Sequence, residues 1–590
     1  MQTLDFYWLS DIMKGIENIW EEEKVKTKKV LAGFTAAAIA ASMITGCGAG
    51  AKTETAVSTE AETTAAEEKE TTAAETVQDA EKSKERILTV SGNGDFGFPS
   101  VYTISPKGQG YMTLSYIFDT LMWKDESGLI PYLAEDCSVS EDGLTYTFQL
   151  RKGVSFTDGT PFTAEDVKFT FDYMKEHPYK WVSVSMVEEA SVVDEHTVEI
   201  KLNKTYNPFL SDVAGSLPIL PKHIWENVTE PETFTEPEAA ISTGPFILEN
   251  YDAAAGTYTF KANEDYFYGD LQIDKLVIAN VSGGDSKEAL LSGEIDAAPN
   301  ISYKAAMSLK DSPEYTVLEG PGLSVTRLYF NFDEEAMAVK EIRQAMYHAV
   351  NLDEIVEKAY GGAGYAGSAG HVQPGTPWYN PDVRQYAYDV ETAKKMLSEA
   401  GAADSNGNGI LEYNGEEMSY TLAFTENDEK LAELLVSYMK AVGIELVPQS
   451  ADDATVKAAI SEGNFELAFN TNGSFGGDPV FLSRFATVGA DGAPSVTGQG
   501  GKTWESEEYN KIYNESAVEQ DDAKRHEQVN ALQEIIAEEL PCLTLYYKKA
   551  VAAYNNTVFD GFYYTPDGIS IAVPFIMNKL VFVSGQWKAQ

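Results

Sequence analysis

The pattern of hydrophobic and polar residues changes at about residue 87 of the 590-residue chain. From there, residues 144–150 and 197–202 alternate between hydrophobic and polar positions, as half-buried strands do, and residues 87–90 predict a further strand. Between the strands, hydrophobic residues recur at helical spacing, and the predicted helices cover residues 164–176, 340–359, 390–400, 428–442 and 521–538. The chain from residue 87 onward is therefore predicted to be a mixed α/β protein.

Residues 48–86 lack this pattern because they consist almost entirely of Ala, Thr, Glu, Ser and Lys. Val57 and Val77 are the only sizeable hydrophobic residues in the segment, so it cannot bury a core. We expect a disordered, acidic tether that holds the folded part away from its point of attachment.

An apolar run precedes this tether and ends in residues 44–47 (ITGC). The run covers residues 30–44 and follows four lysines in residues 24–29, whereas a membrane span needs roughly 20 apolar residues. This combination predicts a signal peptide over residues 1–46 and lipidation of Cys47, which then anchors the chain to the outer face of a membrane. The alternative is a soluble protein with an alanine-rich buried helix and an incidental cysteine.

The first residues do not fit the start of a signal peptide, because they contain Trp8, Trp20 and a run of acids at residues 21–23. We expect translation to begin near Val25, so that residues 1–24 belong to a wrongly assigned start. Mass spectrometry of the unprocessed precursor that detects residues 1–20 would contradict this hypothesis.

The charge balance excludes some partners. The chain has 44 basic and 92 acidic residues, a formal net charge of −48. Such a surface repels nucleic acid and anionic lipid, so we expect no nucleic-acid binding and membrane attachment through acyl chains alone. Besides Cys47, the chain contains Cys137 and Cys542, which we expect to be buried free thiols, although a disulfide between them stays open.

Several motifs resemble chemical sites but lack the required context. Residues 92–97 and 362–367 match a dinucleotide fingerprint, yet neither lies between a strand and a helix, and ligand-facing or flexible loops are the better interpretation. Residues 404–409 begin like a calcium loop, but position twelve is Gly415 instead of Glu, which favours a turn before a hairpin. The six histidines show no metal-ligand spacing, and we predict no catalytic residue, metal or cofactor.

A longer series of segments carries a family pattern. Residues 144–167 (LTYTFQLRKGVSFTDGTPFTAEDV) combine an amphipathic strand, a basic turn, an Asp-Gly turn and a helix capped by Thr163. In order along the chain follow residues 242–246 (STGPF), 328–332 (LYFNF), 342–345 (IRQA), 388–401 (YDVETAKKMLSEAG) and 539–546 (ELPCLTLY). Together these segments resemble the family 5 extracellular solute-binding proteins of ABC transporters, the oligopeptide-, dipeptide- and nickel-binding type.

The resemblance implies a two-lobed, hinge-closing α/β fold of the periplasmic-binding-protein type (class II). The larger lobe would take in residues 87–320 and 551–590, with an inserted subdomain at about 125–215, and the second lobe residues 321–550. Residues 47–86 would be the lipidated tether.

By the same resemblance, the protein is expected to capture a solute without covalent chemistry and to deliver it to the transmembrane subunits of an ABC permease. Ligand binding would favour the closed state. We expect a monomer outside the cytoplasm, on the outer face of a single-membrane bacterium or in a periplasm.

The ligand class stays open between longer peptides bound as an added strand, an oligosaccharide stacked on aromatic residues, and another polar metabolite. In peptide-binding relatives an Asp often pairs with the ligand's ammonium group three residues before an acid-Pro pair, a position held here by Phe475. Without that carboxylate, simple dipeptide recognition is in doubt. Peptides are the favoured class because they are the usual ligands of this family. Nickel comes third because His371 is the only histidine in a loop that could face the cleft.

The candidate ligand-binding residues come from three sources. Phe475, Asn472 and Asp478 lie in the segment that matches the family's ligand loop; Trp378, Tyr102 and Trp504 come from loop context; and Arg327, on a strand entering the second lobe, would pair with a ligand carboxylate. For each residue the alternative is core packing or a solvated surface position.

Two rival classes remain, a secreted hydrolase and a structural surface lipoprotein. A hydrolase would turn over a peptide or glycoside, a binding protein would only be stabilised by it, and a structural protein would do neither.

Overall fold

The computed structural model describes residues 85–281, 285–473, 476–488, 499–571, 573–574 and 576–589. The predicted signal peptide, Cys47, most of the tether and Phe475 lie outside these residues.

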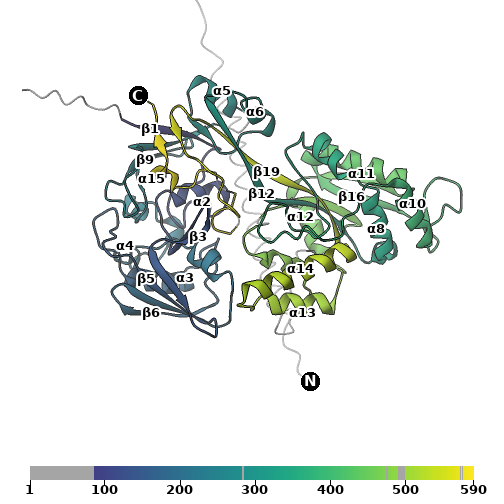
Figure 1. Ribbon diagram of the computed structural model, residues 1–590, viewed down its shortest axis with the longest axis horizontal. Coiled ribbons are helices and arrows are strands. Elements are labelled where there is room, and N and C mark those ends of the chain that lie inside the picture. The colour runs from purple at the N-terminus through teal and green to yellow at the C-terminus, as the bar shows by residue number, and fades with distance from the viewer. Residues whose placement is uncertain are drawn as a thin grey trace, which may run out of the picture. The chain divides into compact units, whose positions relative to one another are not determined.

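One sheet runs through both lobes of the described chain (Figure 1). Its eleven strands lie in the order β17 (Glu445–Ala451), β16 (Ser419–Thr425), β18 (Leu467–Asn472), β12 (Tyr315–Phe330), β19 (Cys542–Asn555), β11 (Ala297–Ala298), β1 (Ile87–Gly92), β10 (Lys275–Asn280), β9 (Thr257–Ala262) and β8 (Phe246–Asp252), while β13 (Gly364–Ala366) pairs with β19. We call the part around β1 and β8–β11 lobe 1 and the part around β16–β18 lobe 2. The long antiparallel strands β12 and β19 belong to both lobes.

The pairing of these two strands changes where they pass from one lobe to the other. Residues Tyr315–Pro321 of β12 pair with 549–555 of β19, and the register shifts between Pro321 and Val325. In this gap Leu323 adopts a left-handed φ of 49°, and a Cβ on Gly322 would lie 2.5 Å from the carbonyl oxygen of Lys548. We call residues 321–325 and the adjoining part of β19 the hinge.

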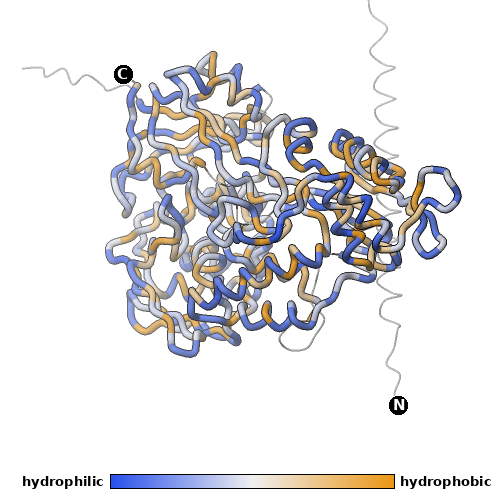
Figure 2. Tube along the Cα trace, turned by 45° about the vertical axis from the view of Figure 1, so that its right-hand side comes forward, coloured by the Kyte–Doolittle hydropathy of each residue, from blue (hydrophilic) through white to orange (hydrophobic). Residues whose placement is uncertain are grey.

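Lobe 2 covers both faces of its part of the sheet with helices. Because side chains alternate along a strand, Leu328 and Phe330 of β12 pack on one face, while Val325 packs on the other. The first face carries α8 (Lys340–His348), α10 (Val390–Glu399) and α11 (Glu429–Ala441); the other carries η6 (Pro479–Phe485), α13 (Glu507–Ser516) and α14 (Asp522–Glu539). In Figure 2 hydrophobic and hydrophilic positions alternate along the helical turns of the tube, as amphipathic packing requires.

Lobe 1 carries a separate four-stranded sheet within residues 134–202. Its order is β4 (Ala134–Val139), β5 (Thr145–Leu150), β7 (Thr197–Leu202) and β6 (Val187–Asp194), and α3 (Ala164–Glu176) packs against it. At the start of α3, the Thr163 amide donates to Asp166 Oδ2 at 2.9 Å, which completes the capping box of this helix. The strand and cap expected from residues 144–167 are therefore confirmed.

Shorter elements complete the described chain. The short strands form three antiparallel pairs. Two are hairpins, β2 (Met122–Asp125) with β3 (Gly128–Pro131) and β14 (Glu412–Tyr413) with β15 (Glu416–Glu417), and the third joins the distant strands β20 (Phe559–Asp560) and β21 (Gln586–Trp587). The remaining helical segments are α2 (Gly108–Ser115), η1 (Phe209–Ala214), α4 (Lys222–Trp225), η2 (Pro231–Thr233), η3 (Pro237–Ala240), α5 (Ser286–Ser292), α6 (Tyr303–Met307), α7 (Glu335–Ala338), α9 (Leu352–Glu354), η4 (Ile355–Ala359), η5 (Glu426–Asp428), α12 (Asp453–Glu462) and α15 (Val581–Ser584).

The helix expected over residues 340–359 is interrupted. Helix α8 ends at His348, and Asn351 adopts an extended conformation whose side chain accepts the Glu354 amide at 3.0 Å. Asn351 therefore caps a new helix instead of continuing the old one. The hydrophobic period spans both segments because both face the same core.

Within the described ranges, no helix is both long and apolar enough to cross a membrane. Cys137 and Cys542 are free, and Cys542 is buried whereas Cys137 is partly exposed.

Candidate functional site

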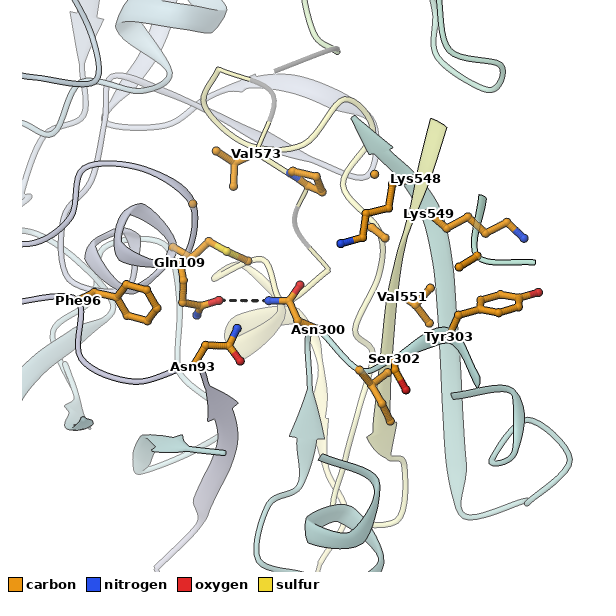
Figure 3. A pocket seen from close by; sticks show the side chains of 17 residues that line it. Asn93, Phe96, Gln109, Asn300, Ser302, Tyr303, Lys548, Lys549, Val551 and Val573 are labelled. Carbon is orange, nitrogen blue, oxygen red and sulfur yellow. Dashed lines mark hydrogen bonds between the residues drawn. The ribbon is translucent and has the colours of Figure 1, made fainter. Parts of the chain in front are cut away.

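A cavity of about 660 Å³ lies beside the hinge (Figure 3). We call it the hinge cavity. It is bounded by the loop after β1, the start of α2, the segment that leads into α6, and the hinge itself. The described residues that line it are Asn93, Phe96, Gly108, Gln109, Met112, Asn300, Ile301, Ser302, Tyr303, Gly322, Ala363, Lys548, Lys549, Ala550, Val551, Val573 and Pro574.

The loop after β1 brings Asn93 and Phe96 to the cavity. Its backbone is fixed because the Phe96 amide donates to the hydroxyl of Tyr258 at 2.8 Å. Gly97 is required there, since it has a φ of 101° and a Cβ would lie 2.4 Å from the Thr103 carbonyl oxygen. Residues 92–97 thus form a shaped loop whose side chains face a cavity.

Amide side chains supply much of the polar lining. Asn300 donates to Gln109 Oε1 at 3.4 Å, which joins the segment after β11 to the start of α2, as the dashed line in Figure 3 marks. Asn93 lies near this pair in the same view. Amides both donate and accept hydrogen bonds, so this wall suits a ligand with peptide-like or hydroxyl groups.

Two consecutive lysines on β19 face different surroundings. Lys549 donates to Glu319 at 3.0 Å and lies 5.1 Å from the ring centre of Tyr303, and its side chain points away from the cavity. Although burial opposes the change, hydrogen bonds from Lys549 and Lys310 lower the pKa of Glu319. The Lys548 side chain is exposed and points into the cavity (Figure 3).

The two lobes touch at a second place, which we call the interlobe junction and define as Lys124, Asp212, Asp478 and Asp567 with their neighbours. Lys124, on β2 of lobe 1, is buried and donates to the Ser570 carbonyl oxygen at 3.4 Å. A Cβ on Gly477 of lobe 2 would lie 3.9 Å from its ammonium nitrogen. Burial lowers the pKa of Lys124, while the charges of Asp212, Asp567 and Asp478 oppose this shift.

The carboxyl groups of the junction respond to the same burial. Burial raises the pKa of Asp212 to about 6, although a hydrogen bond from Ser211 and the charge of Lys124 lower it. Burial also raises the pKa of Asp567, against the charge of Lys124 and a backbone hydrogen bond from Gly477. The pKa values of these carboxyl groups therefore depend on groups from both lobes.

Direct hydrogen bonds also join the lobes near this junction. Asn207 of lobe 1 donates to the carbonyl oxygens of Ser516 at 3.3 Å and Glu519 at 2.7 Å, and it accepts from Gln520 at 2.7 Å. These bonds show that the two lobes are in contact at this point.

The sequence-based candidates fall into separate groups. Asp478 accepts two hydrogen bonds from Arg525, both at 2.7 Å, and its side chain also caps η6 by accepting the Val480 amide. Arg525 lies 5.2 Å from the ring centre of Trp378, which stacks on His526. Asp478 and Trp378 are thus brought together through one arginine.

A second group contains Asn472, Arg327 and Trp504. Asn472 donates to the hydroxyl of Tyr329 at 2.9 Å, and the Arg327 guanidinium lies 4.5 Å from the ring centre of Tyr329. Arg327 and Trp504 line a small cavity inside lobe 2, where Arg327 is only 3% exposed.

Tyr102 stands apart from both groups. It is buried in lobe 1, where its hydroxyl donates to the His177 carbonyl oxygen at 2.7 Å and its ring packs against Trp225. Phe475 and Cys47 lie outside the described residues. None of the six described candidates lines the hinge cavity.

Contacts in the structure show the roles of two other sequence features, His371 and residues 404–409. His371 is fully buried, with Nδ1 2.7 Å from the Thr544 hydroxyl, so it does not face a cleft. In residues 404–409, Asp404 accepts the amides of Gly407 and Gly409, and the strands β14 and β15 follow as the expected hairpin. Among the described residues, no group of three or more acidic, His or Cys side chains could hold a metal ion.

Sequence reasoning missed most of the cavity, including Gln109, Asn300 and Lys548. The sequence did contain one signal for the hinge cavity. Both glycine-rich segments interpreted as loops line it, residues 92–97 through Asn93 and Phe96, and residues 362–367 through Ala363. The other residues come from elements far apart in the chain.

The arrangement is that of a two-lobed binding protein, with one sheet shared by the lobes and a cavity beside the hinge. Comparison with known proteins agrees. Residues 128–492, more than half of the chain, match the model for bacterial extracellular solute-binding proteins, family 5, middle region. The protein belongs to this family, which consists of substrate-binding transport proteins outside the cytoplasm, so the predicted family and fold class are confirmed.

The matches to individual relatives extend over most of the length of each relative. The dipeptide-binding protein of Escherichia coli (strain K12) is 30% identical over 459 residues, 73% of this chain and 82% of that protein. The oligopeptide-binding protein AppA from Bacillus subtilis, solved with a nonapeptide, has a TM-score of 0.62 at 23% identity and covers 83% of this chain and 99% of its own. An oligopeptide-binding protein from Thermotoga maritima, solved with mannohexaose, has a TM-score of 0.64 at 23% identity, covering 86% and 99%.

Proposed function

We propose that the protein is the lipid-anchored substrate-binding component of an ABC importer, which captures oligopeptides between its lobes and delivers them to the permease. The hinge cavity carries this proposal. Its volume of about 660 Å³ falls in the range of sites for small ligands, and its amide side chains complement peptide groups. The relatives named for dipeptides and oligopeptides support the same ligand class.

The hinge supplies the movement that capture requires. Strands β12 and β19 are continuous between the lobes. Their register shifts between Thr326 and Arg327, and the wider interruption of their pairing lies between Pro321 and Val325. A ligand in the hinge cavity contacts this interruption at Gly322 and Lys548, so it interacts differently with the closed and open states. We infer that the closed form presents both lobes to the permease.

Membrane attachment is inferred from Cys47 and the apolar run before it. The variant Cys47→Ala, expressed in a bacterium that lipidates exported proteins, should appear in the soluble fraction or the medium, whereas the wild-type chain should sediment with membranes. Equal sedimentation of both would contradict the anchor.

Capture is tested on the full chain, extracted in detergent from cells grown in rich medium. Native mass spectrometry followed by denaturing analysis should find a ladder of short peptides in the cavity. Turnover of added peptides would instead indicate a hydrolase.

An oligosaccharide is the second candidate. The three amide side chains of the cavity also suit sugar hydroxyls, and Phe96 and Tyr303 supply aromatic faces on which sugar rings pack. Co-purification of a sugar mass instead of peptides would favour this ligand.

A further inference from the structure

We propose that the hinge cavity selects ligands that carry a carboxylate, and that Lys548 is the residue that binds it. This inference rests on the proposed capture of peptides and specifies which peptides are preferred. The carboxylate is the C-terminus of the peptide or an acidic side chain.

The surroundings of Lys548 differ from those of its neighbour. Lys549 is ion-paired to Glu319, as described above. Within the described residues, no hydrogen bond or ion pair of the Lys548 side chain is found, and Figure 3 shows this side chain directed at the cavity. An ammonium group has three donors, and a ligand carboxylate would accept from them.

The remaining lining also favours a negative group. The described residues around the cavity include no Asp or Glu, although the whole chain has 92 acidic and 44 basic residues. Of the two lysines in the lining, Lys549 is paired with Glu319, which leaves Lys548 as the cation that faces the cavity. A cationic ligand group would therefore meet an ammonium group and no compensating carboxylate. Gln109 and Asn300, within the same wall, add neutral donors to an acidic ligand.

Position adds to the effect of charge. Lys548 lies on the strand that both lobes share, opposite Gly322, and its carbonyl oxygen is one of the close contacts of the hinge. The amide wall and Lys548 border the same cavity, so one ligand can contact both. The preference for an acidic ligand should weaken as salt is added.

The test uses the full chain in detergent and a series of alanine oligomers, each prepared with a free C-terminal carboxylate and as the C-terminal amide. Isothermal titration calorimetry should give about tenfold tighter binding of the acid form to the wild-type protein, the size expected of one charge-assisted hydrogen bond. The variant Lys548→Met should bind both forms equally, and Lys548→Arg should keep the preference for the acid.

Lys430→Met is the matched control, because Lys430 is an exposed lysine on α11, away from the cavity lining, and its loss changes the net charge equally. This variant should keep the wild-type preference. Equal binding of acid and amide forms by the wild-type protein, or an unchanged preference in Lys548→Met, would overturn the role of Lys548 and leave peptide capture intact. Failure of the wild-type protein to bind any oligomer would overturn both.

Discussion

Two lysines between the lobes, Lys124 and Lys548, show how differently this protein treats charge. Lys124 is buried in the interlobe junction among three carboxylates, and its pKa is lowered by burial against their opposing effect. Lys548 is exposed and faces a cavity whose described lining contains no acid. At the junction the charge of Lys124 faces carboxylates of the protein itself, whereas in the cavity the charge of Lys548 is available to a ligand. Changes at the junction should therefore cost stability, and changes in the cavity should cost binding.

The largest effect is expected at Asp478. The variant Asp478→Ala leaves Arg525 buried without its partner, because the side chains of Asp478 and Arg525 are only 9% and 10% exposed. The free energy of unfolding should fall by about 3–5 kcal/mol, measured by urea denaturation. Adding Arg525→Met should cost less than the sum of the single changes. A loss below about 1 kcal/mol would show that this ion pair does not hold lobe 2 together.

The next effect is a pH dependence centred on Asp212. Its pKa is raised from 3.8 to about 6 in the folded protein, so the folded state holds a proton that the unfolded chain has released between these values. The free energy of unfolding should therefore decrease as the pH rises through this window, by about 1–3 kcal/mol, and stay lowered above it.

The measurement compares urea unfolding of the wild-type protein and Asp212→Asn at pH values below, within and above the window. Because Asn resembles the protonated acid, the variant should lack this part of the pH dependence. Parallel pH profiles for the two proteins would show that Asp212 titrates normally.

A smaller effect is expected at Asn207, which bonds to lobe 2 through Ser516, Glu519 and Gln520. Asn207→Ala should cost about 1 kcal/mol and favour open lobes, visible as a larger radius of gyration in small-angle X-ray scattering without ligand. Asn203→Ala is the control, since Asn203 bonds to Ser185 within lobe 1. The same expansion in both variants would mean that the bonds of Asn207 do not govern closure.

The smallest effect on stability is expected at Lys548. Lys548→Met should change the free energy of unfolding by less than about 0.5 kcal/mol, because the side chain is exposed and has no ion pair in the described structure. Thermal unfolding of the ligand-free protein measures this. A loss as large as that of Asp478→Ala would remove the distinction between the two regions.

The local part of this fold was predictable from sequence. The helix at residues 164–176 has the expected bounds because Thr163 and Asp166 mark its start by short-range hydrogen bonds. The interruption at Asn351 was not predicted, since the hydrophobic period continues across it while one side chain changes the backbone. Periodicity detects a buried face more readily than a local cap.

The site was less predictable because it depends on contacts between distant segments. Gln109 and Asn300 are 191 positions apart in the chain and meet through a hydrogen bond. Lys548 follows Tyr547 on a strand, and nothing in the local pattern tells which of two adjacent lysines pairs with Glu319 and which faces a cavity. Asp478 was chosen from a family segment, but its partner Arg525 lies on another helix.

The place of β19 in the shared sheet has a consequence for the order in which the protein is made. This strand, residues 542–555, lies between β12 and β11, so it joins the two parts of the sheet. A ribosome supplies it more than 200 residues after its partners β11 and β12, and this separation makes the final pairing entropically costly. We expect the growing polypeptide to stay without a completed sheet until residues 542–555 have emerged, which suits a protein that folds outside the cytoplasm.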